Sequence, residues 1–181
     1  MTHEVQGLVT ATFGRHMVVR TAEGTELQAR PFGRALEVVC GDEVRCRIDA
    51  QHDEVHVIEV LPRRTALWRA NSRGGAEPVV ANLTQLLVVL APLPLPDLFV
   101  IDRYLAAAVA AGIPSTLIVN KSELGIEPEL ARELEVYAAA GFAALACSAA
   151  SGVGMERLRT ALAPGARAAF VGQSGVGERP A

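Results

Sequence analysis

A glycine-rich segment ends a regular alternation of apolar and amphipathic segments, and it constrains the fold more than any other feature. Gly172-Gln173-Ser174-Gly175-Val176-Gly177 directly follows the apolar run 168–171. Glycine-rich turns after a strand let successive backbone N–H groups point at a phosphate. The segment matches the first six positions of the phosphate-binding pattern G-x-x-x-x-G-K-[ST], but Glu178 follows where that pattern has lysine. We therefore predict a phosphate cradle at the edge of an α/β sheet.

Residues 82–181 have the period of an α/β domain. Continuous apolar runs alternate with helical patterns, which predicts parallel strands buried on both faces and joined by right-handed crossovers. We expect 168–171 to lie beside 86–91 as an edge strand whose unpaired backbone groups favour self-association. The predicted strands are 86–91, 115–119, 143–147 and 168–171, and the predicted helices are 97–111, 127–140 and 154–162.

Residues 1–61 contain short segments in which apolar and polar residues alternate, as in half-buried strands. About five strands in so few residues fit a partly open OB-type β-barrel, although alternation alone does not separate it from an SH3-like barrel. Residues 62–81 carry four arginines and a single acid, and we interpret them as a basic linker. The predicted strands lie near 4–12, 15–21, 25–30, 43–49 and 54–61.

Asn120-Lys121-Ser122-Glu123 follows the second predicted parallel strand and has the chemistry to bind guanine. Guanine offers two adjacent donors that one carboxylate, here Glu123, can accept together, whereas adenine offers an acceptor at N1. Asn120 would tie neighbouring loops and meet the base edge, and the aliphatic stem of Lys121 would cover the base face. Glu123 keeps the charge of the more usual aspartate and adds one methylene. A capped strand-to-helix loop without a ligand is the alternative.

Ser148-Ala149 follows the third parallel strand, where small residues let a backbone N–H approach the guanine carbonyl oxygen. In an ordinary P-loop GTPase the phosphate loop opens the domain, whereas here it follows both base-reading motifs. The order predicts a circularly permuted GTPase. We predict no catalytic and no metal-ligating residue, and the candidate nucleotide-binding residues are Asn120, Lys121, Glu123, Ser148, Ala149, Gly172, Gln173, Ser174, Gly175, Val176 and Gly177.

The chain resembles the ribosome-small-subunit-dependent GTPases, in which an OB domain precedes a circularly permuted GTPase domain. The resemblance runs from about Val5 to Gly177. It implies a GTP- and Mg²⁺-dependent factor in late maturation of the small ribosomal subunit (30S), which contacts the subunit and its rRNA and is stimulated by it. The segments that carry it are Val60-Leu61-Pro62-Arg63-Arg64, Ala81-Asn82-Leu83-Thr84-Gln85, Ile101-Asp102-Arg103-Tyr104, Asn120-Lys121, Ser148-Ala149 and 170–177.

The sequence departs from this family after Gly177. Family members continue into Lys-Ser, a helix, switch segments and a zinc-binding C-terminal domain, so we expect an incomplete domain that is truncated in the P-loop. Glu178 stands where a lysine would meet phosphate, and a charge pair at 4 Å is worth about 4 kcal/mol at an effective dielectric of 20. We therefore expect that this chain neither binds GTP tightly nor hydrolyses it.

Two other functions stay open. An ATP-using P-loop enzyme is disfavoured by the carboxylate of Glu123. A nucleotide-independent RNA-binding module would use arginines on phosphates, although the first 75 residues hold ten arginines against ten Asp or Glu. Base stacking would add little, since we expect Phe13 and Phe32 in the core. The arginines considered are Arg45, Arg47, Arg63, Arg64, Arg69 and Arg73.

The composition fits a cytoplasmic protein with neither a membrane nor a DNA partner. Hydrophobic residues make up 50% and charged residues 20% of the 181 residues, as in ordinary globular proteins. The longest apolar stretch ends at Pro92, far short of the roughly 20 residues of a membrane helix. The three cysteines form no C-x-x-C pair, so we expect them to be reduced and structural.

Overall fold

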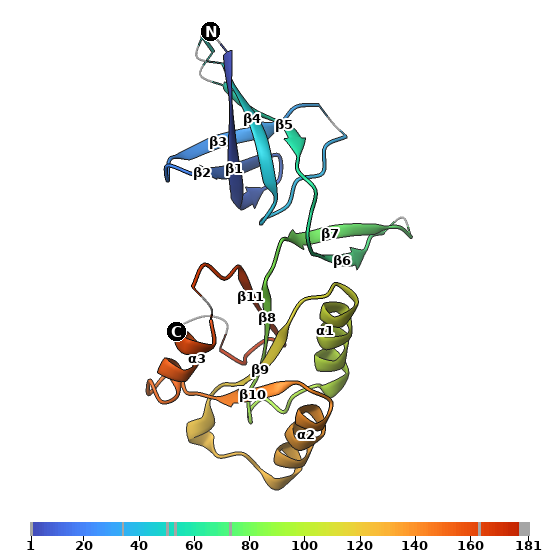
Figure 1. Ribbon diagram of the computed structural model, residues 1–181. Helices are drawn as coiled ribbons and strands as arrows, with labels where there is room; N and C mark the ends of the chain where they lie inside the picture. The colour runs from blue at the N-terminus through green and yellow to red at the C-terminus, as the bar shows by residue number, and fades with distance from the viewer. Residues whose placement is uncertain are drawn as a thin grey trace. The chain divides into compact units, whose positions relative to one another are not determined.

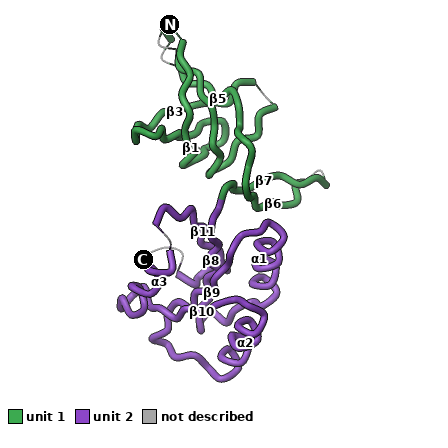
Figure 2. Tube along the Cα trace, in the orientation of Figure 1, with its two compact units in different colours: residues 1–82 green, residues 83–181 purple. Residues whose placement is uncertain are grey.

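The computed structural model describes residues 2–33, 35–49, 51–52, 54–72, 74–162 and 164–177. The chain divides into two compact units, Met1–Asn82 and Leu83–Ala181, which Figure 2 colours green and purple. Within the described parts, no helix is both long and apolar enough to span a membrane.

Unit 1 is built on a closed five-stranded barrel. The strand order is β1-β2-β3-β5-β4, with β3 and β5 parallel and the other neighbours antiparallel (Figure 1). The OB-type barrel is confirmed, and it is closed rather than partly open. Its strands are β1 (Thr2–Phe13), β2 (His16–Thr21), β3 (Glu26–Pro31), β4 (Glu43–Asp49) and β5 (Glu54–Val60), and its interior is filled by Val9, Met17, Val19, Ala29, Val44, Cys46 and Val57.

The expectation that Phe13 and Phe32 lie in the core is wrong. Their exposed fractions are 68% and 62%. Each residue lies where a strand runs out into a turn, and each is followed by a glycine with positive φ, Gly14 at 61° and Gly33 at 87°. The aromatic rings therefore stand outside the barrel interior and remain available as contact surface.

A β-hairpin lies within the segment that the sequence suggested as a linker. β6 (Ala66–Ala70) and β7 (Ala76–Ala81) pair antiparallel, with an irregular register after Leu67 where Trp68 lies opposite Pro78. Proline within an apparent strand argues against strand pairing unless it lies at an edge or a bulge. Pro78 lies at such an irregularity, which explains why the sequence pattern did not predict the hairpin.

A buried carboxylate ties the start of this hairpin segment to the barrel. Asp42 is completely buried and accepts bonds from Arg63 Nε (2.7 Å) and Arg63 Nη2 (2.9 Å). Asn82, also buried, accepts from Arg64 N (2.8 Å) and donates to Gly41 O (2.9 Å). Both ends of the segment 63–82 are thus bonded to the loop at residues 41–42.

Unit 2 is a parallel sheet with helices on both faces, as predicted. The strand order is β10-β9-β8-β11, and Figure 1 shows α1 and α2 on one face and α3 on the other. The strands are β8 (Gln85–Leu90), β9 (Ser115–Val119), β10 (Ala143–Ala146) and β11 (Ala168–Gly172), and the helices are α1 (Leu98–Ala110), α2 (Pro128–Ala139) and α3 (Met155–Ala161).

β11 lies at the edge of the sheet, next to β8, as the sequence suggested. Within the described residues β8 is its only strand neighbour, and Phe170 on β11 is 53% exposed. An edge that carries an exposed aromatic side chain favours pairing with another chain. Self-association through β11 stays a prediction.

Candidate nucleotide-binding site

The candidate residues occupy loops at the carboxyl ends of parallel strands. Residues 120–124 follow β9, residues 147–151 follow β10, and residues 172–177 extend from the last residue of β11. Ligands of open parallel sheets bind at the carboxyl ends of the strands. The three motifs, which are separated in the sequence by helices, therefore meet on one side of the sheet.

Asn120 joins the motifs through both ends of its side-chain amide. It is 6% exposed; its Nδ2 donates to Val176 O (2.9 Å) and its Oδ1 accepts from Ala149 N (3.0 Å). Its backbone N–H donates to Leu90 O at the end of β8 (2.8 Å). The predicted role of Asn120 in tying neighbouring loops is thus observed, and its contact with a base edge remains a prediction.

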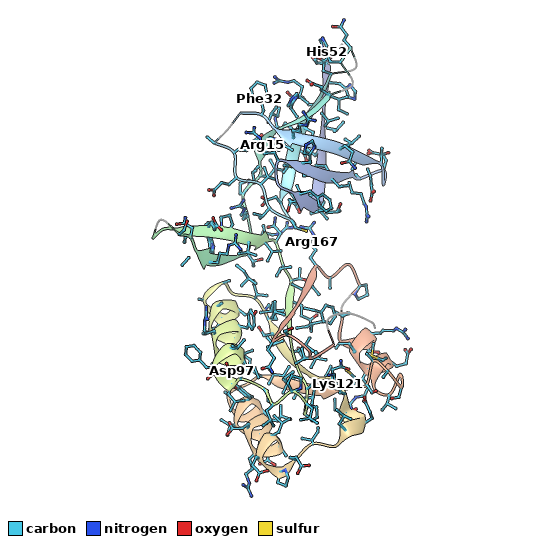
Figure 3. The ribbon with its side chains drawn as sticks, turned by 180° about the vertical axis from the view of Figure 1, so that it is seen from behind. Arg15, Phe32, His52, Asp97, Lys121 and Arg167 are labelled. Carbon is cyan, nitrogen blue, oxygen red and sulfur yellow. The ribbon has the colours of Figure 1, made fainter. Side chains whose placement is uncertain are left out.

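Lys121 connects the base-reading loop to the glycine loop by a second route. Its backbone is left-handed (φ 58°), and its Nζ donates to Gly175 O (2.7 Å) and to Leu93 O (3.1 Å). Two carbonyl oxygens thus hold the ammonium group of Lys121, the residue labelled in Figure 3. The side chain is therefore extended along the loops rather than free in solvent.

Glycine is required at both ends of the loop 172–177 for lack of space. A Cβ on Gly172 would overlap Val89 O, and one on Gly177 would overlap the Asn120 side-chain nitrogen. Gly177 also has φ 107°, which L residues rarely adopt. Val176 between them is completely buried, whereas Ser174 is exposed. The loop is thus anchored through one apolar side chain and two close backbone approaches.

Gln173 connects the glycine loop to a fourth segment, residues 91–97. The sequence did not predict that this segment belongs to the site. Its Oε1 accepts from Asp97 N (2.7 Å) and its Nε2 donates to Leu95 O (2.9 Å). Asp97 in turn caps α1, accepting from Phe99 N at 3.0 Å. Because residues 91–97 follow β8, they also lie at the carboxyl ends of the strands. The proline-rich sequence after β8 is the feature that could have indicated this loop.

Glu123 lies beside the Ser148 loop with its carboxylate exposed to solvent. A hydrogen bond with the side chain of the fully buried Ser148 lowers the pKa of Glu123, and a backbone bond and Lys121 act in the same direction. Glu123 is therefore ionised at neutral pH, as acceptance of two guanine donors requires. The Ala149 N–H donates to Asn120 Oδ1, and its contact with a guanine carbonyl oxygen remains a prediction.

A cavity of about 500 Å³ opens beside the glycine loop. In the described part of the chain, no three His, Cys, Asp or Glu side chains cluster as a metal site. The cavity is lined by Val89, Tyr104, Phe170, Val171, Gly172 and Gly177.

Comparison with known families decides the assignment. Residues 60–179, more than half of the chain, match the model of the RsgA GTPase family. The chain belongs to the RsgA GTPase family. It is 43% identical to the small ribosomal subunit biogenesis GTPase RsgA of Pseudomonas fluorescens (strain Pf0-1) and 38% identical to that of Alcanivorax borkumensis. Each match covers 97% of this chain and 52% of the relative, so the chain spans about half the length of these RsgA proteins.

Two solved structures share the fold. YjeQ from Thermotoga maritima superposes with a TM-score of 0.76 at 25% identity, over 97% of this chain and 62% of YjeQ. YloQ, described as a circularly permuted GTPase, gives a TM-score of 0.68 at 20% identity with the same coverage of both chains. The predicted combination of a barrel and a circularly permuted α/β domain is confirmed.

Proposed function

We propose that this chain carries the base-binding and phosphate-binding segments of a GTPase that acts in biogenesis of the small ribosomal subunit. One observation carries the proposal. Asn120 and Lys121 bond directly to the backbone of the glycine loop, at Val176 O and Gly175 O, so the two halves of a nucleotide site are held together. The named RsgA relatives support the role in the small subunit.

Each residue has a specific part in this proposal. Glu123 accepts the two guanine donors, the stem of Lys121 covers the base face, and the backbone N–H groups of 172–177 surround the phosphates. Mg²⁺, when bound, neutralises phosphate charge. Asn120 positions the loops, because its side-chain amide is bonded to protein at both ends.

Reversing the charge after the glycine loop is expected to create measurable GTP binding. Glu178 lies outside the described residues, and its carboxylate should repel the phosphates that a lysine would attract. In calorimetric titration the 181-residue chain should show no saturable GTP binding, whereas Glu178→Lys should bind GTP saturably and at least about tenfold more tightly than it binds ATP.

Two further variants distinguish this from a general charge effect. In the Glu178→Lys background, Glu123→Ala should remove the preference for GTP over ATP, whereas Glu127→Ala, which changes an exposed acid before α2, should leave it unchanged. A low-micromolar dissociation constant for the unmodified chain would contradict the charge argument. Equal losses in the two alanine variants would contradict guanine recognition by Glu123.

Binding of RNA by unit 1 is a second candidate function, and the exposed aromatic side chains favour it. Phe13, Phe32 and Trp68 are 68%, 62% and 55% exposed. The arginines are less available than the sequence suggested, and Arg73 lies outside the described residues. The five candidate arginines within the described residues all form ion pairs: Arg45 with Glu4 and Glu59, Arg47 with Glu4, Arg63 with Asp42, Arg64 with Glu43, and Arg69 with Glu77.

The cost of freeing these arginines differs among them. Exposed ion pairs contribute about 0–1 kcal/mol, so phosphates can displace the acids from Arg45 or Arg64. Arg63 is different, since its partner Asp42 is completely buried and would be left without its cation. We therefore remove Arg63 from the candidate RNA contacts and keep the exposed arginines.

Weak RNA binding with strong salt dependence is the expected result for residues 1–80. Contacts made mainly by arginine on phosphate release counterions, so affinity for a structured RNA should fall steeply between about 50 and 200 mM salt. Fluorescence anisotropy measures this. Affinity that is insensitive to salt, or that is lost only in Trp68→Ala, would instead indicate base stacking.

A further inference from the structure

Three of the four histidines in the chain surround one cavity on the barrel. His16 begins β2, His52 lies in the turn between β4 and β5, and His56 lies on β5. The cavity has a volume of about 330 Å³, and Arg30 on β3 and Glu54 on β5 also line it. We propose that this cavity binds a phosphate group and that protonation of its histidines controls the binding.

Arg30 supplies the fixed positive charge. It lies beside His56 in the pairing of β3 with β5, and it is exposed. Within the described residues it has no carboxylate within 4 Å, unlike Arg20, Arg45 and Arg47 of the same barrel. A guanidinium without an acidic partner at the rim of a cavity is suited to an oxyanion, because its fork of donors matches phosphate oxygens.

The remaining charged groups make the cavity sensitive to pH. Counted over the described groups, Arg30 is opposed by Glu54 and by Asp49, which bonds to His52 Nδ1 at 2.8 Å. With neutral histidines the net charge is −1, and protonation of all three raises it to +2. Glu54 also lies 3.9 Å from His56 Nε2, and Arg47 opposite His56 is paired with Glu4.

Histidine is the side chain that changes charge between about pH 5 and 8. The hydrogen bond that His52 donates to Asp49 raises the pKa of His52, so this ring gains its proton at a higher pH than an isolated histidine. Since the proton favours an anion, affinity for phosphate should rise as the pH falls. The acids Asp49 and Glu54 keep the cavity unattractive to anions at higher pH.

An exposed ring adjoins the cavity. Phe32 contacts His56 edge to face, with ring centroids 5.9 Å apart, and Arg15 Nη2 donates to Gly33 O beside it (3.2 Å; Figure 3). The phosphate could belong to an RNA strand, with a base against Phe32, or to a free anion. The inference does not rest on the nucleotide site, because the cavity lies wholly in unit 1.

Titration of the 181-residue chain with inorganic phosphate, followed by histidine ring NMR signals, tests the proposal. At about pH 5.5 phosphate should shift the signals of His16, His52 and His56, and affinity should fall at least about tenfold by about pH 8. The charge of sulfate is constant over this pH range, so sulfate should lose affinity to the same extent. That result would show that the loss comes from titration of the protein and not of the ligand. Arg30→Gln should weaken binding about fivefold or more.

Arg20→Gln is the matched control, because Arg20 is an exposed barrel arginine that is paired with Glu26 outside the cavity. It should leave phosphate affinity within about twofold. If oligouridine shifts the same signals and phosphate competes with it, the ligand is an RNA phosphate; if only phosphate and sulfate act, it is a free anion. Absent shifts, equal effects of Arg30→Gln and Arg20→Gln, or affinity independent of pH would overturn the proposal.

Discussion

Arg63→Ala is expected to lower the free energy of unfolding of unit 1 by about 3–5 kcal/mol. The variant leaves the completely buried Asp42 carboxylate without its cation, and breaking a buried pair by removing one partner has a cost of this order. The buried carboxylate also raises the pKa of Arg63, in keeping with a strong pair. Urea denaturation followed by fluorescence measures the effect, since the single tryptophan of the chain, Trp68, lies in unit 1.

The neighbouring residue provides the control. Arg64 is paired with Glu43, but its side chain is 67% exposed, so Arg64→Ala should change stability by about 0–1 kcal/mol. For RNA binding the order reverses, because Arg64 is free to leave its partner for a phosphate. Similar destabilisation by both variants would show that burial of Asp42 does not decide the strength of the pair.

Asn120→Ala is expected to destabilise unit 2 by about 2–4 kcal/mol and to open the candidate site. It leaves Val176 O without its partner at a buried position and Ala149 N without its partner at a partly buried one, and an unsatisfied buried group costs about 1–3 kcal/mol. Hydrogen exchange of the β8 amides, which lie in unit 2, measures this without interference from the barrel.

Two comparisons support the interpretation of that result. Asn71→Ala, in the hairpin turn of unit 1, should leave exchange in β8 unchanged. Lys121→Ala removes two bonds to carbonyl oxygens at a half-exposed position, so its cost should be smaller, about 1 kcal/mol. Unchanged protection of β8 in Asn120→Ala would mean that the glycine loop is held by Val176 packing alone.

Sequence patterning predicted the framework of both units because burial repeats with the period of each element. The strand 115–119 has the bounds that its apolar run predicts, and the helix expected at 127–140 forms at Pro128–Ala139. Asn120 and the glycine loop could be placed at the site because both directly follow parallel strands, whose carboxyl ends lie at the same end of the sheet.

The features that the sequence did not predict depend on partners distant in the sequence, on backbone atoms or on the geometry of turns. Arg63 looked like a phosphate-binding residue because its partner, Asp42, lies 21 positions earlier in the sequence. The segment 91–97 enters the site through the Leu93 and Leu95 carbonyl oxygens, and backbone atoms carry no sequence signature. The alternation that identifies strands does not indicate on which side of a turn an aromatic ring such as Phe32 will lie.

The bond from Asn120 to Val176 also sets the order in which the site can form. It joins residues 56 positions apart, and β11 must reach the edge beside β8 after β9 and β10 have already been synthesised. Domains fold from the N-terminus as the chain leaves the ribosome. The loops 120–124 and 147–151 therefore emerge before the loop 172–177. Because the loop 172–177 is translated after Asn120 and Ala149, the bond that joins Asn120 to this loop cannot form on a nascent chain until β11 has docked beside β8.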